Sequence, residues 1–214
     1  MKSGGKWTNI CSKKRSDEVE KLLKELHLGK LLETPRQLQG GLMHRMDKAV
    51  CESGTYAVKT LNPHIMKRPE ACRNMVISEK IAAKMKSVVP AVAALSFQGQ
   101  QLLCIENAYY MVFPWQEGGS IYPPCITPSH CEKMGDVLGR IHAADVQVDG
   151  LNKECLKDMA LDWDMPLSKM DDIPLEAECR KSIPQLETWL QNARRTVRRL
   201  SVHQVISHRD LDPK

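Results

Sequence analysis

The sequence predicts an α+β protein with a small β-rich N-terminal lobe and a helical C-terminal lobe. Short apolar runs broken by glycines and polar turns dominate up to about Phe113, whereas longer segments with helical periodicity dominate after it. The stretch FPWQEGGS, which is rich in proline and glycine, separates the strand-like part of the sequence from the helical part. We therefore expect a tail and helix over 1–33, a small lobe over 34–115 and a helical lobe over 116–214.

Composition excludes several classes of protein. Hydrophobic residues make up 42% of the 214 residues and charged residues 27%, which is typical of a soluble globular protein. The net charge of +5 is compatible with an anionic ligand but too small to indicate a nucleic acid partner. The sequence has neither a signal-like apolar segment nor an apolar run of about 18 residues. We expect a cytoplasmic protein with no membrane partner.

The eight cysteines include no C-x-x-C pair. In a reducing compartment they are expected to be free thiols and small core residues rather than disulfides or metal ligands. The sequence therefore predicts no metal site among its cysteines.

An amphipathic helix is expected before the sheet. Ser16 is a suitable N-cap, and the acidic residues that follow favour the positive end of a helix dipole. Apolar residues then recur at helical spacing, namely Val19, Leu22, Leu23 and Leu26. Gly29 can close this helix. Residues 1–15 lack such periodicity, and we expect a tail there.

The small lobe is expected to continue with strands and one helix. About three antiparallel strands are predicted over 34–61, with turns at Gly40–Gly41 and Ser53–Gly54. A helix is predicted over 69–88, because Pro and Glu open it and basic residues recur at helical spacing. Two further strands are predicted in AVAALSF and LLCIENAYYMVF, joined by the turn-like QGQQ.

Two helices are expected in the second lobe. Thr127 and Pro128 suit the N-cap and first helical positions of a helix that runs to about residue 145. A second helical pattern occupies 185–200, and Pro184 marks its start or a kink. The basic run ARRTVRRL at 193–200 is interpreted as a solvated face of this helix, with nucleic acid binding as the weaker alternative.

Lys59 is a candidate ligand-binding residue. It lies in YAVKTL, where its side chain leaves one face of the strand while Val58 leaves the other, and a buried lysine needs an anionic partner. The alternative is a solvent-facing lysine on a half-exposed strand. Glu79, with apolar neighbours one helical turn away, is the preferred carboxylate partner. Glu70 is the competitor, although its place in the first helical turn already explains it.

The closing segment HRDLDPK carries the second group of candidates. Asp210 lies in a loop directly after a β-branched run, where a carboxylate can accept a proton from an incoming hydroxyl, and His208 can brace the loop. A simple Asp–Pro turn would be the alternative for an isolated tripeptide. The order of the elements favours chemistry, because a glycine turn, a strand lysine, a helix glutamate and a Pro/Gly hinge all precede it.

Five motifs follow one another along the chain: LQGGLMHRM, YAVKTL, YYMVFPWQEGGSI, MGDVLGRIHAAD and VISHRDLDPK. In this order they resemble the aminoglycoside phosphotransferase and choline kinase family, which is related to the protein kinases. The resemblance covers nearly the whole chain from about Thr34. It implies a protein-kinase-like two-lobe fold. It also implies that ATP, accompanied by Mg²⁺, phosphorylates a hydroxyl group of a small molecule.

The resemblance also implies roles for individual residues. Gly40 and Gly41 would lie over the ATP phosphates, where the absence of side chains allows close approach of the backbone. Lys59 would contact the α- and β-phosphates and pair with Glu79. The main chain from Phe113 through Trp115 to Gln116 would receive adenine. The remaining roles lie in the last motif: Asp210 would be the catalytic base or the group that orients the hydroxyl, His208 would brace the loop, and Lys214 would help to neutralise the transferred phosphoryl group.

The catalytic loop of this group has the form H-R-D-x-x-x-x-N, so with Asp210 in place the asparagine is due just after Lys214. We therefore expect the sequence to be a fragment with an incomplete helical lobe, with metal ligands beyond residue 214 and little activity of its own. The alternative function is a non-catalytic nucleotide-binding or interaction module derived from the same family.

Overall fold

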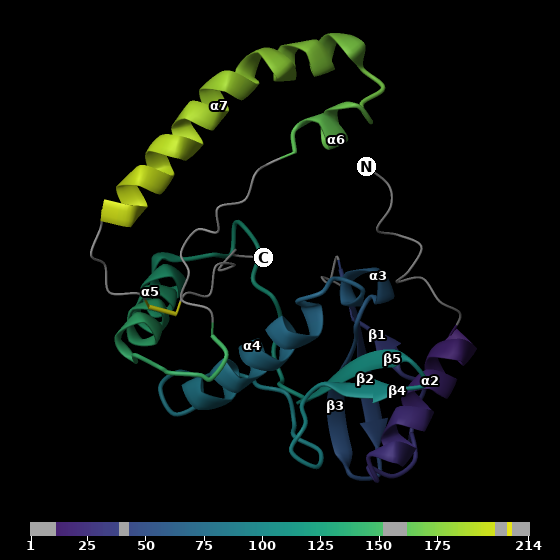
Figure 1. Cartoon of the computed structure of the whole chain (residues 1–214). Coiled ribbons are helices and arrows are strands. Elements are labelled where there is room, and N and C mark those ends of the chain that lie inside the picture. The colour runs from purple at the N-terminus through teal and green to yellow at the C-terminus, as the bar shows by residue number, and fades with distance from the viewer. Residues whose placement is uncertain (1–11, 39–42, 152–161, 200–204, 207–214) are drawn as a thin grey trace. The chain divides into compact units, whose positions relative to one another are not determined.

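The computed structural model describes residues 12–38, 43–151, 162–199 and 205–206. It divides into two compact units (Figure 1). The first comprises Met1–Leu151 and Ile206–Lys214, and the second comprises Asn152–Val205. The boundary expected at residues 115–116 stays a prediction. Across the described residues, none of the helices has both the length and the apolar character needed to cross a membrane.

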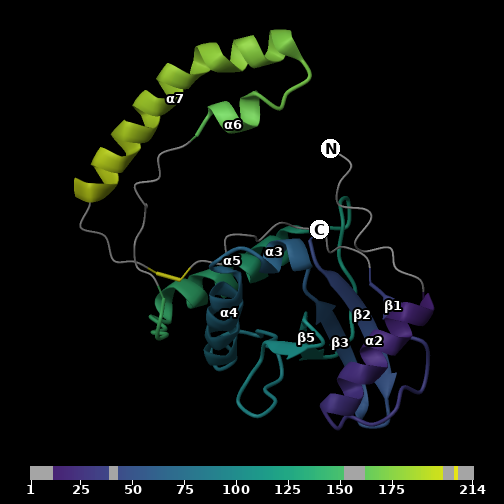
Figure 2. The same cartoon turned by 45° about the vertical axis from the view of Figure 1, so that its right-hand side comes forward.

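The first unit is built on a five-stranded antiparallel sheet with the order β1-β2-β3-β5-β4. The strands are β1 (Arg36–Gln37), β2 (Arg45–Cys51), β3 (Gly54–Thr60), β4 (Leu103–Ile105) and β5 (Ala108–Pro114). The three strands predicted over 34–61 are confirmed, with a turn at residues 52–53. Helix α2 (Ser12–Glu25) and helix α4 (Ala71–Met85) lie on opposite sides of this sheet in both views (Figures 1 and 2).

The face of the sheet beneath α2 holds the main apolar core. Its buried members are Val19, Leu22, Leu23, Ala49, Cys51, Val58, Leu103, Tyr110 and Val112. Strand alternation explains this composition, because alternate residues of β2 are buried while their neighbours are half-buried. Residues on the other face of the central strands therefore point toward the α4 side.

Helix α2 differs from the prediction at both ends. It begins at Ser12 rather than Ser16, and the Arg15 side chain hydrogen-bonds to Gln37 at 2.9 Å, which anchors the extra turn. It is closed by His27, with a positive φ of 55°, rather than by Gly29. The Leu28 N–H donates to the Leu23 carbonyl and the His27 N–H to the Lys24 carbonyl, which are the two bonds of a Schellman motif.

Gly29 has a different role in the chain. A Cβ atom there would lie 2.6 Å from the Glu52 carboxylate, whose Oε2 accepts a hydrogen bond from the Lys30 N–H. The glycine is required for this close approach and for its φ of +84°.

The predicted strand over AVAALSF is wrong in part. Ala94 and Leu95 lie along β5 with one bond from the Leu95 N–H to the Val112 carbonyl, but no regular ladder forms. One reason is that the Ala94 N–H donates instead to the Glu79 side chain. The segment LLCIENAYYMVF, predicted as the next strand, forms the hairpin β4–β5 instead. Glu106 and Asn107 both adopt positive φ and reverse the chain between the two strands.

The helix expected over 69–88 is confirmed as α4, and a short helix, α3 (Pro63–Met66), precedes it. Asn62 caps α3 by accepting a hydrogen bond from the His64 N–H. Leu61, Met66 and Ala71 form a second buried cluster at this point. The cluster fixes the start of α4 against the end of β3.

Helix α5 (Pro128–Ala143) confirms the helix predicted after Thr127. The Thr127 N–H donates to His130 Nδ1 at 3.0 Å, which satisfies one of the backbone groups at the N-terminus of the helix. The second unit contains α6 (Asp164–Leu167) and α7 (Ile173–Arg199). Helix α7 begins well before the predicted residue 185, so Pro184 lies inside it, and the helix is bent along its length (Figure 1).

Candidate active site

Lys59 lies on the sheet face that α2 does not cover. Its register partners are Met46 on β2 and Met111 on β5. Burial lowers the pKa of Lys59, and the charge of Glu79 opposes this shift. Among the described residues, no carboxylate lies within 4.0 Å of the Lys59 ammonium. The described part of the site thus presents a partly desolvated cation to which none of the described carboxylates pairs directly.

Glu79 is half-buried on α4. It lies near enough to Lys59 for its negative charge to raise the pKa of the lysine. Its Oε2 accepts a hydrogen bond from the Ala94 N–H at 2.7 Å, so the carboxylate is held by the backbone rather than by the lysine. Glu70, the competing candidate, is exposed and pairs with Arg73 at 2.9 Å. Of the two carboxylates, Glu79 is therefore the one whose charge acts on Lys59.

The end of β5 forms the opposite edge of this face. Phe113 pairs with Ala57 on β3, and Ala57 pairs with Lys48 on β2, so the three side chains share one face. The Lys48 ammonium lies over the Trp115 indole, 4.4 Å from the ring centroid. The Trp115 N–H donates to the Thr55 carbonyl at 3.3 Å, so this backbone donor is already occupied.

His44 directly precedes β2 and is only 9% exposed. Its Nδ1 accepts a hydrogen bond from the Asn62 N–H at 3.1 Å. Burial lowers the pKa of His44, and the charge of Lys59 lowers it further, so the two side chains are neighbours. The sequence interpretation included His44 in LQGGLMHRM but gave it no role, because only the fold brings it beside Lys59.

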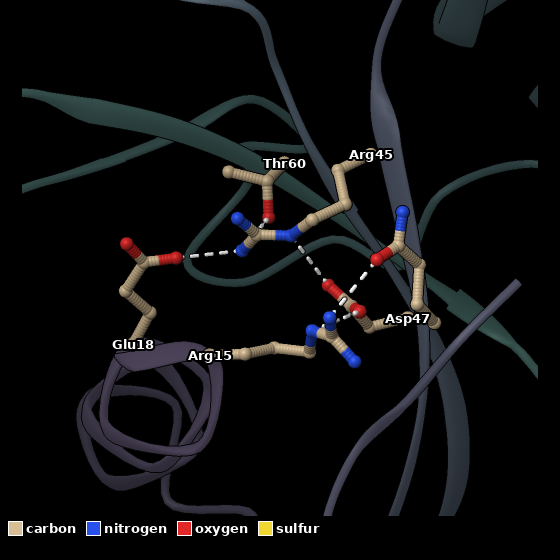
Figure 3. A network of polar contacts seen from close by, with 6 residues as sticks. Arg15, Glu18, Arg45, Asp47 and Thr60 are labelled. Atoms are coloured by element: carbon tan, nitrogen blue, oxygen red, sulfur yellow. Dashed lines mark hydrogen bonds and ion pairs between the residues drawn. The ribbon is translucent and has the colours of Figure 1, made fainter. Parts of the chain in front are cut away.

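A buried polar network lies on the opposite face of the sheet (Figure 3). The Arg45 guanidinium contacts Asp47 at 2.8 Å, Glu18 of α2 at 2.6 Å and Thr60 of β3 at 3.1 Å. Arg15 of α2 approaches Asp47 at 3.4 Å. The network joins α2 to β2, which directly follows His44, and to β3, which carries Lys59. The alternation of charged residues in RMD was a signal that the sequence interpretation did not use.

Several predicted site residues lie outside the described part of the chain. They are Gly40, Gly41, His208, Asp210 and Lys214. Within the described ranges, no group of three His, Cys, Asp or Glu side chains could hold a metal ion. The residues described here therefore do not fit a Mg²⁺ site, and no chemical step is assigned to one.

An apolar groove of about 540 Å³ separates α4 from α5. Its lining includes Ile81, Met85, Met134, Ile141 and Ile206. Glu79 also borders this groove, whereas Lys59 does not. The lining is mainly apolar, which suits packing between elements better than recognition of a charged ligand.

A five-stranded antiparallel sheet with a strand lysine near a helix glutamate, followed by helices, defines a kinase-like phosphotransferase architecture. Residues 34–214 match the model of the phosphotransferase enzyme family, and the chain belongs to this family. The resemblance inferred from the motifs and the predicted α+β kinase-like fold are thereby confirmed.

Among solved structures, the chain is similar to spectinomycin phosphotransferase, whose crystal structure contains ADP and spectinomycin. The TM-score is 0.60 and the sequence identity 13%, so the likeness concerns the fold. The match covers 92% of this chain and 63% of the spectinomycin phosphotransferase chain. No curated protein sequence matches the chain.

Proposed function

We propose that the protein is an ATP-dependent phosphotransferase that acts on a hydroxyl group of a small molecule. The environment of Lys59 carries this proposal. The lysine is partly desolvated and has no direct anionic partner among the described residues. It lies on a face of the sheet that extends to the end of β5. A cation in this position is stabilised by an anionic ligand. Membership of the phosphotransferase family makes a nucleotide polyphosphate the natural candidate.

The proposed site assigns each part of the nucleotide to a part of the small lobe. Lys59 contacts the α- and β-phosphates, its position supported by the charge of Glu79, while Gly40 and Gly41 lie over the phosphates. The main chain at Phe113–Gln116 receives the base. Because the Trp115 N–H is bonded to Thr55, the Gln116 N–H is the donor we assign to the base.

The proposed reaction transfers the γ-phosphoryl group to the acceptor hydroxyl. A bond forms between the acceptor oxygen and the γ-phosphorus, the bond to the β–γ bridging oxygen breaks, and ADP leaves. Asp210 orients the hydroxyl and accepts its proton, His208 holds the loop, and Lys214 neutralises charge on the transferred group.

Nucleotide titrations by calorimetry test the binding half of this proposal. Lys59→Met should weaken ATP and ADP binding by at least about tenfold, because charge-assisted contacts to the phosphates are lost. Adenosine binding should not change. Lys80→Met, at an exposed lysine on α4, is the matched control and should bind ATP normally. Equal affinities in Lys59→Met and the unaltered chain would contradict the assignment.

Phosphotransfer to a panel of small-molecule alcohols and aminoglycosides tests the catalytic half. Asp210→Asn should reduce turnover by orders of magnitude and leave ATP affinity nearly unchanged, since the aspartate is assigned to the acceptor hydroxyl. Nucleotide binding without any transfer would instead support the non-catalytic module, and retained turnover in Asp210→Asn would remove its role as base.

A further inference from the structure

His44 is a buried histidine whose two ring nitrogens have different environments. Arg45, the next residue, points to the α2 side of the sheet, where it contacts Glu18. His44 precedes β2 in a bend, and its hydrogen bond from the Asn62 N–H together with its electrostatic interaction with Lys59 places it at the end of β3 that carries this lysine. His44 therefore lies on the face that we assign to the nucleotide.

The hydrogen bond from Asn62 determines the tautomer of the ring. A backbone N–H can only donate, so His44 Nδ1 must be unprotonated to accept at 3.1 Å. The neutral ring consequently carries its proton on Nε2. A doubly protonated ring would lose this bond and place a second cation beside Lys59.

No group in the described parts of the chain accepts a hydrogen bond from Nε2–H of His44. This nitrogen is also not among the side-chain polar atoms that are sealed from solvent without a partner. A histidine that is nine-tenths buried normally has both nitrogens satisfied. Among the residues that the structure describes, this donor has no acceptor and the neighbouring Lys59 has no direct anionic partner.

We propose that the Nε2–H of His44 donates a hydrogen bond to a phosphate oxygen of the nucleotide bound beside Lys59, which makes His44 a phosphate-binding residue. The proposal rests on the proposed function, since it uses the same nucleotide site. His44 acts as a neutral donor, so it adds direction to the attraction that Lys59 supplies. Its bond to Asn62, at the N-cap of α3, holds the ring in place before the nucleotide arrives.

Two substitutions separate the nitrogens of the ring. In His44→Asn the side-chain oxygen replaces Nδ1 and can still accept from Asn62, but the donor at the Nε2 position is lost. In His44→Gln the amide reaches the Nε2 position, but the acceptor at Nδ1 is lost. The full chain is titrated with ATP, ADP, adenosine and inorganic tripolyphosphate by calorimetry, and thermal unfolding is followed in parallel.

We expect His44→Asn to melt close to the unaltered chain and to bind ATP and ADP roughly tenfold or more weakly, the effect of one hydrogen bond to a charged group. Adenosine binding should stay the same. His44→Gln should recover most of the ATP affinity while melting at a lower temperature. Normal ATP binding by His44→Asn, or an equal loss of adenosine binding, would overturn the proposal.

The tripolyphosphate titration distinguishes failure of this inference from failure of the proposed function. If the unaltered chain binds tripolyphosphate but no nucleotide, the function proposal fails, and the same pattern of variants still decides the role of His44. If it binds neither ATP nor tripolyphosphate, both proposals are wrong.

Discussion

Arg45 and Asp47 show how individual charged residues can be part of a folded core. Their side chains are 2% and 0% exposed. Arg45 contacts polar partners on β2, β3 and α2, and Asp47 contacts Arg45 of β2 and Arg15 of α2. A buried ion pair adds little stability compared with an apolar pair of the same size, but removal of one partner leaves the other charge uncompensated. The network therefore makes the attachment of α2 to the sheet sensitive to single substitutions.

Asp47→Ala is expected to lower the free energy of unfolding by about 3–5 kcal/mol, because Arg45 would remain buried without the fully buried carboxylate of Asp47. Lys21→Ala is the control, since it removes another contact between α2 and the sheet, the exposed pair with Glu106. It should cost far less, because the pair is exposed to solvent. Urea unfolding of both variants measures the difference, and equal costs would show that burial of the pair has no special effect.

Among the helices, α4 connects parts of the first unit that are distant in sequence. Glu79 joins it to Ala94, while Arg73 and Lys84 donate to the carbonyls of Gly150 and Gln147, in the segment after α5. The basic stripe predicted on this helix is thus used partly to hold backbone carbonyls. A shift of α4 would change both the charge near Lys59 and the position of residues 145–150.

Substitutions at Glu79 separate its hydrogen bond from its charge. Glu79→Ala loses both and is expected to cost about 1.5–3 kcal/mol for the bond to the Ala94 N–H. Glu79→Gln keeps an acceptor and should retain most of that stability. Urea unfolding checks this order, and equal stability of the two variants would mean that the Ala94 bond contributes little.

The pKa of Lys59 should fall further in Glu79→Gln, because the negative charge that opposes the effect of burial is gone. The lysine would then cost stability at pH values below its folded pKa, where it is charged. This cost disappears above the ordinary lysine pKa, where the side chain is neutral in both states. Titration of Lys59 by NMR measures the change in its pKa. An unchanged pKa in Glu79→Gln would contradict the role of Glu79 in stabilising the charged form of the lysine.

The whole chain consists of two units, and all the described residues that we assign to the nucleotide belong to the first. A ligand that binds only the folded form stabilises the part of the structure that forms its site. Helix α7 belongs to the second unit and contributes none of the assigned nucleotide contacts.

Hydrogen exchange should therefore show added protection of β2, β3 and α4 when ADP is present at about a hundred times its Kd. At this concentration, binding stabilises the folded form by about 2.7 kcal/mol. Exchange in α7 should be unchanged. Adenosine serves as the control, with weaker protection near His44 and Lys59. Equal protection of α7 by ADP would show that the nucleotide couples the two units.

Much of the fold could be predicted because its signals are local. The turn signal at Ser53–Gly54, the short apolar runs and helical periodicity correctly indicated β1–β3, α4 and α5. The prediction was wrong where a distant residue decides the structure. The Ala94 N–H donates a hydrogen bond to the Glu79 side chain rather than to a neighbouring strand. The Arg15 side chain extends α2 through its hydrogen bond to Gln37. In both cases, the deciding partner is at least 15 residues away.

The sequence by itself determined the family and the α+β fold class, because motifs such as YAVKTL and HRDLDPK are contiguous. It also singled out Lys59 and Glu79 as candidates, whose catalytic roles stay predictions. Only the tertiary structure shows that His44 lies beside Lys59 with its Nδ1 accepting a hydrogen bond. That result depends on a hydrogen bond from Asn62 and on the register of β2 against β3, since burial and electrostatic proximity arise from neighbours in space rather than in sequence.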